Sequence, residues 1–232
     1  MIQLGTDPNC TIIFYTFGGI KGQIMKKTYL LTLIIVAAVL SGCKTQTSET
    51  SALDVIMTRT SIRSFTGAPV SPEQIETILK AGMAAPSAIN IQPWRFVVMT
   101  NKEEIGQAFG NNPRGADMYT KAGAVIVVCG EASHMAKPFG QPDAPETPQP
   151  NMFWFEDCSA AAENILLAAH SMGLGAVWTA GYPAEDRMEP ISKALGLPEN
   201  VIPLCVIPVG VPAENPSPKD KWKPENIHWE KW

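Results

Sequence analysis

The stretch Gly-Leu-Gly-Ala-Val-Trp-Thr-Ala-Gly-Tyr-Pro, residues 173–183, separates two elements that decide the fold. Residues 155–172 before it are rich in alanine and apolar at helical spacing, and Gly173 follows as a typical C-terminal glycine, which predicts a helix. Residues 175–179 are predicted to form a strand. This order, helix and then strand, is the reverse of a dinucleotide-binding fingerprint. Gly181 permits close approach of the backbone to a flat ligand.

On both sides of this stretch the chain alternates between predicted helices and strands. Ser51 and Ser71 are predicted to cap helices, and Pro72 occupies the first helical position of the second one. Residues 137–151 contain five prolines and are predicted to form a surface loop. Pro203 and Pro208 are expected to break the last strand. The helices are expected over residues 51–59, 72–83, 101–109, 155–172 and 184–195, and the strands over 95–100, 124–129, 175–179 and 201–211. This order predicts three layers in a single α+β or α/β domain.

Two groups of cations are candidates for binding a phosphate. Arg-Thr-Ser-Ile-Arg, residues 59–63, places two guanidiniums around a hydroxyl, just after a predicted helix end. Arginine offers forked donors that match phosphate oxygens, and Ser61 adds one more donor. The alternative for this pentamer is solvated surface charge. Lys219 and Lys221 flank Asp220 beyond the last strand, and such a pair is usually solvated when taken alone.

A second candidate is the turn Ala-Pro-Ser-Ala-Ile-Asn-Ile-Gln-Pro-Trp, residues 85–94. Two prolines stiffen this connection between a predicted helix and a predicted strand. Asn90 and Gln92 can each present an amide donor together with a carbonyl acceptor. The edge of an isoalloxazine ring alternates donors and acceptors, so these side chains can match it. The alternative is a loop whose polar groups satisfy its own backbone.

Taken together, the R-x-S-x-R, P-S-x-x-N-x-Q-P-W, G-L-G-x-x-W-T-x-G-Y-P and K-D-K motifs resemble the nitroreductase-like flavoproteins over residues 52–232. The resemblance implies an α+β fold, a three-layer α/β/α sandwich with a central mixed sheet, in an intertwined homodimer. It also implies FMN at the subunit interface. NAD(P)H would reduce this FMN in a ping-pong cycle whose small-molecule acceptor is a nitro compound, a quinone or a related molecule.

The same resemblance implies which residues bind the cofactor, and it implies no catalytic side chain, because the flavin carries the chemistry. The cations at 59–63, together with Lys219 and Lys221, would hold the phosphate. The 86–92 turn would line the ring from one subunit, and residues 180–181 would contact it from the other side. Ala180 departs from members that carry an acidic residue there, and residues 111–114 are expected to reach the flavin. The expected cofactor-binding residues are Arg59, Thr60, Ser61, Arg63, Pro86, Ser87, Ala88, Asn90, Gln92, Ala180, Gly181, Lys219 and Lys221.

The first part of the chain has the pattern of a targeting segment. A basic start at Met25 precedes an apolar run over residues 29–40, which is short for a membrane span. Leu-Ser-Gly-Cys, residues 40–43, resembles the lipobox of bacterial lipoproteins. Residues 25–42 are thus predicted to be a lipoprotein signal peptide, Cys43 to be lipidated and 43–51 to be a tether, with 1–24 an upstream extension that precedes the real start. The alternative is an uncleaved transmembrane anchor. Either reading tethers the domain to a membrane outside the cytoplasm, on the periplasmic or cell-surface side.

Composition narrows the remaining function classes. The formal net charge is −4, and no basic stripe is present, so nucleic acid is not an expected partner. Five cysteines show no paired spacing and three histidines do not cluster, so neither a disulfide framework nor a metal site is expected. Two alternatives to an enzyme stay open. One is a membrane-tethered flavin-binding lipoprotein without NAD(P)H turnover, and the other is a structural surface lipoprotein without a cofactor.

Overall fold

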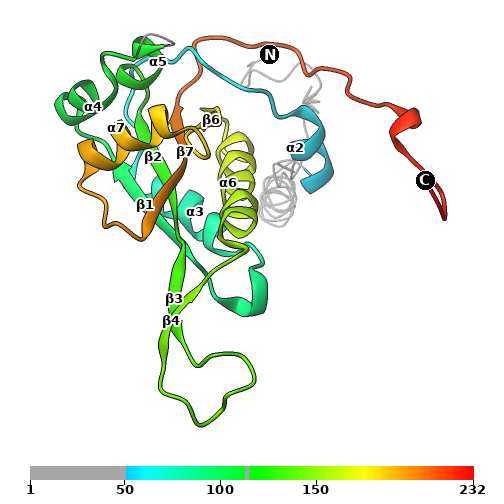
Figure 1. The fold of residues 1–232 in the computed structure, drawn as a ribbon. Helices are drawn as coiled ribbons and strands as arrows, with labels where there is room; N and C mark the ends of the chain where they lie inside the picture. The colour runs from blue at the N-terminus through cyan, green and yellow to red at the C-terminus, as the bar shows by residue number, and fades with distance from the viewer. Residues whose placement is uncertain (1–50, 113–114) are drawn as a thin grey trace, which may run out of the picture. The chain divides into compact units, whose positions relative to one another are not determined.

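The main sheet has β2 (Ala124–Glu131) and β7 (Val201–Gly210) at its centre in a computed structural model that describes residues 51–112 and 115–232 (Figure 1). The remaining strands of this sheet are β1 (Trp94–Met99), β5 (Gly175–Ala176) and β6 (Thr179–Ala180). The strand order is β1-β2-β7-β5, and β6 also pairs with β7. The signal peptide, Cys43 and nearly all of the tether that the sequence predicts lie outside the described residues.

Every pairing among the described strands of this sheet is antiparallel, so the expected mixed sheet is corrected. The reason lies in the connections. The chain leaves β1, passes through two helices and returns beside β1 in the opposite direction, and the helix between β6 and β7 does the same. Each connection therefore joins neighbours that run in opposite directions, as antiparallel pairing requires.

Helices cover both faces of the sheet, which confirms the α+β class and the three layers (Figure 1). Alternate residues of β2 point to opposite faces, as the period of a strand requires. One face carries α3 (Pro72–Met83) and α6 (Trp154–Ser171), and the other carries α4 (Lys102–Phe109), α5 (Ala116–Thr120) and α7 (Glu185–Leu195). Ile126 and Val128 join the apolar cluster under α3 and α6, whereas Val125 and Val127 join the cluster under α4, α5 and α7.

Local signals in the sequence explain where the helices begin and end. Ser51 and Ser71 cap α2 (Ala52–Thr58) and α3, as predicted, and each completes a capping box. Asn101 caps α4 in the same way through its side-chain oxygen. The left-handed Gly196 ends α7. Among the described residues, no helix combines the length and the apolar character that a membrane span requires.

Strand β7 is continuous, although Pro203 and Pro208 were expected to break it. Pro208 pairs with Val125, and Pro203 lies beside a register shift at which β7 carries one extra residue, Leu204. Proline is tolerated next to such a bulge because the ladder there needs no donor from it. The bulge also presents the Leu204 carbonyl, which accepts hydrogen bonds from the N–H groups of Gly181 (2.9 Å) and Tyr182 (3.0 Å). The proline-containing strand thus anchors the end of the 173–183 stretch.

The proline-rich segment after β2 is a projecting hairpin rather than wholly a loop (Figure 1). Strands β3 (Ser133–Ala136) and β4 (Thr147–Pro150) pair antiparallel, so the prediction of a loop was wrong at residues 147–150. Proline has no N–H to donate, but a two-stranded hairpin has an outer edge where no N–H donor is required.

Beyond β7 the chain leaves the sheet and extends away from it (Figure 1). From residue 213 onward every residue is exposed. The segment contains one short helix, η2 (Pro224–Asn226), and three tryptophans that are 71% to 100% exposed, namely Trp222, Trp229 and Trp232. Large apolar side chains are seldom gathered in this way on a surface that contacts only water.

Candidate functional site

The 59–63 segment is fixed against the sheet immediately after α2. The N–H of Ile62 donates to the carbonyl of Ala176 in β5 at 3.0 Å. A Cβ at Gly175 would lie 2.6 Å from a methyl carbon of Ile62, so only glycine allows this close approach. The Arg-Thr-Ser-Ile-Arg and Gly-Leu-Gly motifs are therefore packed together, although more than a hundred residues separate them in the sequence.

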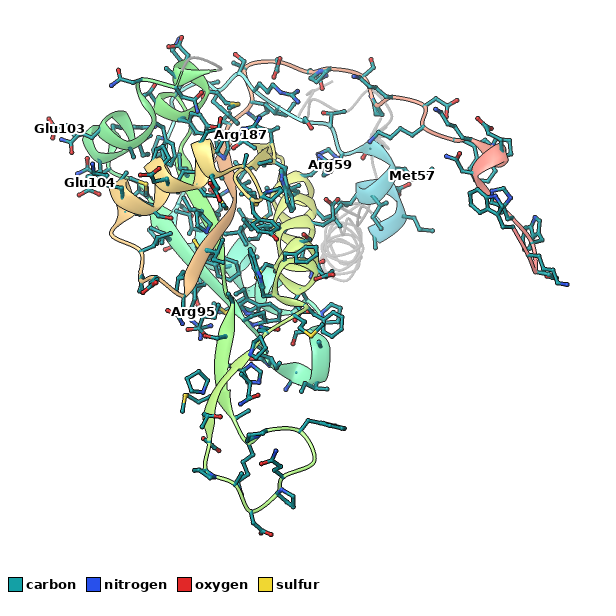
Figure 2. The ribbon with its side chains drawn as sticks, viewed as in Figure 1. Met57, Arg59, Arg95, Glu103, Glu104 and Arg187 are labelled. Carbon is teal, nitrogen blue, oxygen red and sulfur yellow. The ribbon has the colours of Figure 1, made fainter. Side chains whose placement is uncertain are left out.

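The cationic side chains of this segment differ in their surroundings. Arg59 is largely buried and its Nε lies 3.5 Å from a carboxylate oxygen of Glu163 on α6 (Figure 2). Arg63 is exposed, and its guanidinium donates to the Ser61 carbonyl at 3.5 Å. The backbone N–H groups of Arg63 and Ser64 both donate to the carboxylate of Glu214. Glu214 thus satisfies the backbone of the segment and leaves the guanidinium of Arg63 available to a ligand.

Arg63 lines a pocket of about 590 Å³ between the helices of one face and the end of the sheet. Small-molecule sites usually have volumes of about 300–1,000 Å³. Arg187, at the start of α7 beside β6, supplies a second cation and donates to the Ala180 carbonyl at 3.5 Å (Figure 2). Within the described part of the chain, neither Arg63 nor Arg187 forms an ion pair. The other lining residues are Ala108, Phe109, Asn111, Asn112, Met118, Tyr119, Thr179, Ala180, Asp186, Pro190, Ile191 and Val206.

A chain of hydrogen bonds stabilises the wall of this pocket. The Tyr119 hydroxyl donates to Thr179 Oγ1 at 3.0 Å, and Thr179 Oγ1 donates to the Val206 carbonyl at 2.6 Å. The Tyr119 ring stacks on Phe109 with centroids 4.9 Å apart. Burial raises the pKa of the Tyr119 phenol, and the bond to Thr179 partly opposes that shift. Tyr119 therefore stays protonated and joins α5 to β6 and β7.

The 86–92 turn has a strained backbone. Ile89, Asn90 and Gln92 have φ values of 43°, 60° and 55°, in the left-handed region that side chains disfavour. Each such residue costs about 1–3 kcal/mol and persists only where its surroundings enforce it. Residues 88–90 form the short helix η1 (Ala88–Asn90).

Hydrogen bonds that involve side chains help to hold this turn. Ser87 Oγ accepts from the Gln92 N–H at 3.1 Å, and the Gln92 side-chain amide donates to Asn90 Oδ1 at 2.8 Å. Arg95 donates to the Gln92 carbonyl at 3.3 Å and is itself fixed by Glu131 at 2.7 Å. The Ala88 N–H donates to the buried carboxylate of Asp157 on α6. Asn90 and Gln92 are therefore oriented in advance, although both are exposed.

The close approach expected at Gly181 is to its own chain. A Cβ there would lie 2.9 Å from the Pro203 carbonyl oxygen, so Gly181 lets the stretch pack on the bulge of β7. Ala180, one residue earlier, is exposed and lines the pocket. The small side chain of Ala180 leaves the backbone of β6 open to the pocket. Of residues 180 and 181, Ala180 is therefore the one placed to contact a ligand in the pocket.

The structure brings some of the predicted site residues together and separates others. Arg63 and Ala180 line one pocket with Asn111 of the expected 111–114 segment, whereas Arg114 lies outside the described residues. No residue of the 86–92 turn lines this pocket. Lys219 and Lys221 are exposed on the C-terminal segment, and no described hydrogen bond or ion pair joins either one to residues 59–63.

Three further residues at or near the site were missed from the sequence. Tyr119 and Arg187 line the pocket, and Asp157 anchors the turn. Tyr119 lies in the five-residue helix α5, which is too short to show a period. Asp157 resembles the acidic residues that commonly occupy the first turn of a helix, and Arg187 follows two acidic residues at the start of α7 without a recognisable motif around it. Only their tertiary contacts distinguish them.

The cysteines of the described region are structural. Burial raises the pKa of the Cys129 and Cys158 thiols to about 12, and it raises the pKa of Cys205 as well. A thiol that stays protonated is a poor nucleophile and a poor metal ligand. Across residues 51–112 and 115–232, no group of three or more histidine, cysteine, aspartate or glutamate side chains is placed to hold a metal ion.

Comparison with known proteins identifies relatives along most of the chain. The model of the nitroreductase family matches residues 56–116 and 110–211. An NADH dehydrogenase/NAD(P)H nitroreductase of Methanothermobacter thermautotrophicus is 45% identical over 185 residues, which cover 80% of this chain and 90% of that protein.

Solved structures agree with these matches. The crystal structure of an NADH dehydrogenase/NAD(P)H nitroreductase from Bacteroides thetaiotaomicron is 44% identical, with a TM-score of 0.68 over 78% of this chain and 98% of that one. The NADPH:FMN oxidoreductase of Vibrio harveyi, solved in complex with NAD⁺, is 29% identical. It superposes with a TM-score of 0.63 and covers 78% of this chain and 77% of that one.

Proposed function

The chain belongs to the nitroreductase family, and on that basis we propose that it uses FMN and NAD(P)H to reduce a nitro compound, a quinone or a related acceptor by a ping-pong mechanism. It is a nitroreductase-like oxidoreductase, as its relatives are. The Vibrio harveyi relative is named an NADPH-flavin oxidoreductase, and a Bacillus subtilis relative is named an FMN reductase. These names support both a flavin and a nicotinamide.

One observation carries the proposal. Arg63 and Ala180 belong to two motifs far apart in the sequence, and they line the same pocket together with Arg187. The pocket combines two cations that lack ion-pair partners in the described region with an apolar wall that includes Phe109, Met118 and Val206. FMN has an anionic phosphate and a flat, largely apolar ring, so the donor set and the wall suit it.

The proposed cofactor contacts follow the motifs. Arg59, Thr60, Ser61 and Arg63 would neutralise and hold the phosphate, and Lys219 and Lys221 would complete that site. Pro86, Ser87, Ala88, Asn90 and Gln92 would line one side of the ring, with Ala180 and Gly181 on the other side. FMN, when bound, supplies the hydride and electron transfer. The protein orients the ring through the turn, and its cations balance the negative charge.

We further propose a homodimer with a shared site. The 86–92 turn does not line the pocket of its own subunit, so a second copy would bring its turn to that pocket. Large apolar side chains are exposed on α2 and on the C-terminal segment, with Leu53 72% and Trp229 82% exposed, and burial between two copies would cover them. A second copy would also bring Lys219 and Lys221 within reach of the phosphate.

The location is a separate proposal that rests on residues outside the described structure. Residues 25–42 would act as a lipoprotein signal peptide, and Cys43 would carry the lipid, so that the domain is tethered to a membrane outside the cytoplasm. The basic start at Met25, the short apolar run and the Leu-Ser-Gly-Cys ending support this proposal.

An absorbance spectrum of the purified domain tests the enzymatic proposal. A yellow protein that NADPH or NADH bleaches, and that an added quinone or nitro compound restores, is the expected result. A yellow protein that neither nicotinamide bleaches would favour flavin binding without turnover. A colourless preparation that does not bind added FMN would contradict the proposal.

A further inference from the structure

Asp157 is an unusual residue of this fold because it is a carboxylate buried beneath a backbone turn. It is 7% exposed, and Asn151 is the one other polar residue that is buried in the described part of the chain. Its two carboxylate oxygens lie 3.1 Å and 3.2 Å from the backbone nitrogen of Ala88. A buried carboxylate is costly unless it accepts hydrogen bonds. Asp157 thus commits both oxygens to one N–H, at the start of the turn.

The other bonds that hold the turn are local. Ser87 and Arg95 lie within five residues of Gln92, the residue that they contact. Asp157 reaches the turn from α6, 69 residues away in the sequence. It is therefore the direct link between the strained conformation of residues 89–92 and the core helix of the domain. The first turn of α6 also favours a negative charge at this position.

We propose that Asp157 is a positioning residue for the flavin, which acts by holding the Ala88 N–H so that Ser87 and Asn90 keep the orientation that the ring requires. This inference rests on the proposed flavin function. Asp157 does not line the pocket itself, so it acts through the turn. It should affect the isoalloxazine ring rather than the phosphate, because the cations at 59–63 lie elsewhere in the subunit.

The test compares Asp157→Ala and Asp157→Asn with a matched control on the same helix. Asn164 lies on α6, and its side-chain amide donates to the Ala81 carbonyl of α3 at 3.0 Å. Asn164→Ala therefore removes a bond between α6 and the backbone of another element without touching the turn. The readouts are amide hydrogen exchange of residues 88–92 in the flavin-free protein, the affinities for FMN and riboflavin, and the visible spectrum of bound flavin.

For Asp157→Ala we expect exchange in the turn to accelerate at least about tenfold. Affinity for FMN and for riboflavin should fall equally, by about 10- to 100-fold, which corresponds to one hydrogen bond to a charged group. The flavin absorption bands should shift as well. Asp157→Asn keeps an acceptor at the same place and should restore most of the affinity and the spectrum. Asn164→Ala should change neither the exchange of the turn nor the spectrum.

The outcomes separate this inference from the function on which it rests. If the unaltered protein binds no flavin, the proposed function fails, and the role of Asp157 toward a flavin fails with it. If the unaltered protein binds flavin but Asp157→Ala and Asn164→Ala have equal effects, only the role of Asp157 is overturned. Should Asp157→Ala not fold, Asp157→Glu replaces it. The glutamate side chain is longer by one methylene, so this variant should accelerate amide exchange in the turn, whereas Asp157→Asn should not. Equal exchange rates in these two variants would overturn the inference.

Discussion

At the scale of single residues, the proposed phosphate-binding role of Arg59 can be tested separately from any role in folding. Arg59→Ala should weaken FMN binding by about 1.5–3 kcal/mol, the usual range for a hydrogen bond to a charged group. Riboflavin lacks the phosphate, so its affinity should change much less. Titration of both ligands by fluorescence checks the prediction.

The control for Arg59 is Lys80→Ala, which removes a cation from an exposed pair with Glu76 on α3. Exposed pairs of this kind contribute about 0.3–0.5 kcal/mol, so this variant should bind both ligands normally. Equal losses of FMN and riboflavin in Arg59→Ala would mean that the segment does not recognise phosphate.

The buried thiols allow a second prediction at this scale. The pKa of Cys129 and Cys158 is raised from 9.0 to about 12, which lowers the thiolate fraction at pH 8 by about a thousandfold. Iodoacetamide should therefore leave Cys129, Cys158 and Cys205 unmodified in the folded protein and alkylate all three in denaturant. Peptide mass mapping gives the answer, and rapid labelling of any of the three in the folded state would contradict the burial described above.

At the scale of elements, Gly175 determines whether the 59–63 segment can lie on β5. Gly175→Ala would place a methyl group 2.6 Å from Ile62 and should destabilise the fold by about 1–3 kcal/mol. Because Arg59 and Arg63 lie on either side of Ile62 in the same short segment, FMN affinity should fall as well. Gly106→Ala is the matched control. Gly106 lies within α4, and a methyl group added there would meet no atom within 4 Å, so alanine should stabilise the fold by about 0.5–1 kcal/mol. Denaturant titration gives the free energy of unfolding of both variants. An unchanged free energy of unfolding in Gly175→Ala would show that the contact with Ile62 is not tight.

Elements with local signals were predictable from the sequence, and elements that depend on distant partners were not. Ser51, Ser71 and Asn101 mark helix starts through their own side chains, so α2, α3 and α4 were predicted correctly. The strand at β7 was predicted, but its continuity through Pro203 and Pro208 was not, and β4 was not predicted at all. Both depend on which edge of a ladder faces a proline, and that information lies in the neighbouring strand. The same distinction applies to the site. The 59–63 motif is contiguous and was predicted as a unit, whereas Asp157 acquires its role only by contact with Ala88.

At the scale of the whole molecule, the proposed shared site predicts that two defective variants restore one intact site when they form a dimer together. Arg59→Ala and Asn90→Ala should each weaken FMN binding when alone. In a two-fold dimer that contains one subunit of each kind, one site receives both defects and the other receives neither. Mixed dimers, formed by unfolding and refolding the two variants together, should therefore bind FMN tightly at about half of their sites. The stoichiometry of tight binding is the measurement, and no recovery on mixing would mean that each site belongs to one subunit.

The proposed anchor has its own test on the full chain. Cys43→Ala should remove the lipid-carrying residue and block cleavage, so an uncleaved precursor without lipid should accumulate. Mass spectrometry and detergent partitioning report both properties. An unchanged mature mass and unchanged partitioning in Cys43→Ala would refute the lipoprotein proposal.

The β3–β4 hairpin affects the tendency of the folded protein to aggregate. Two-stranded ribbons that project into solvent have free edges, and a free edge can recruit a strand from another chain and begin aggregation. Strand β4 carries prolines at 148 and 150, which have no N–H to donate, so its donors at 147 and 149 are those that serve the ladder with β3. The outer edge of β4 is therefore left without N–H donors and is a poor template for a further strand. The prolines that obscure this hairpin in the sequence thus protect this edge of the folded protein against pairing with another chain.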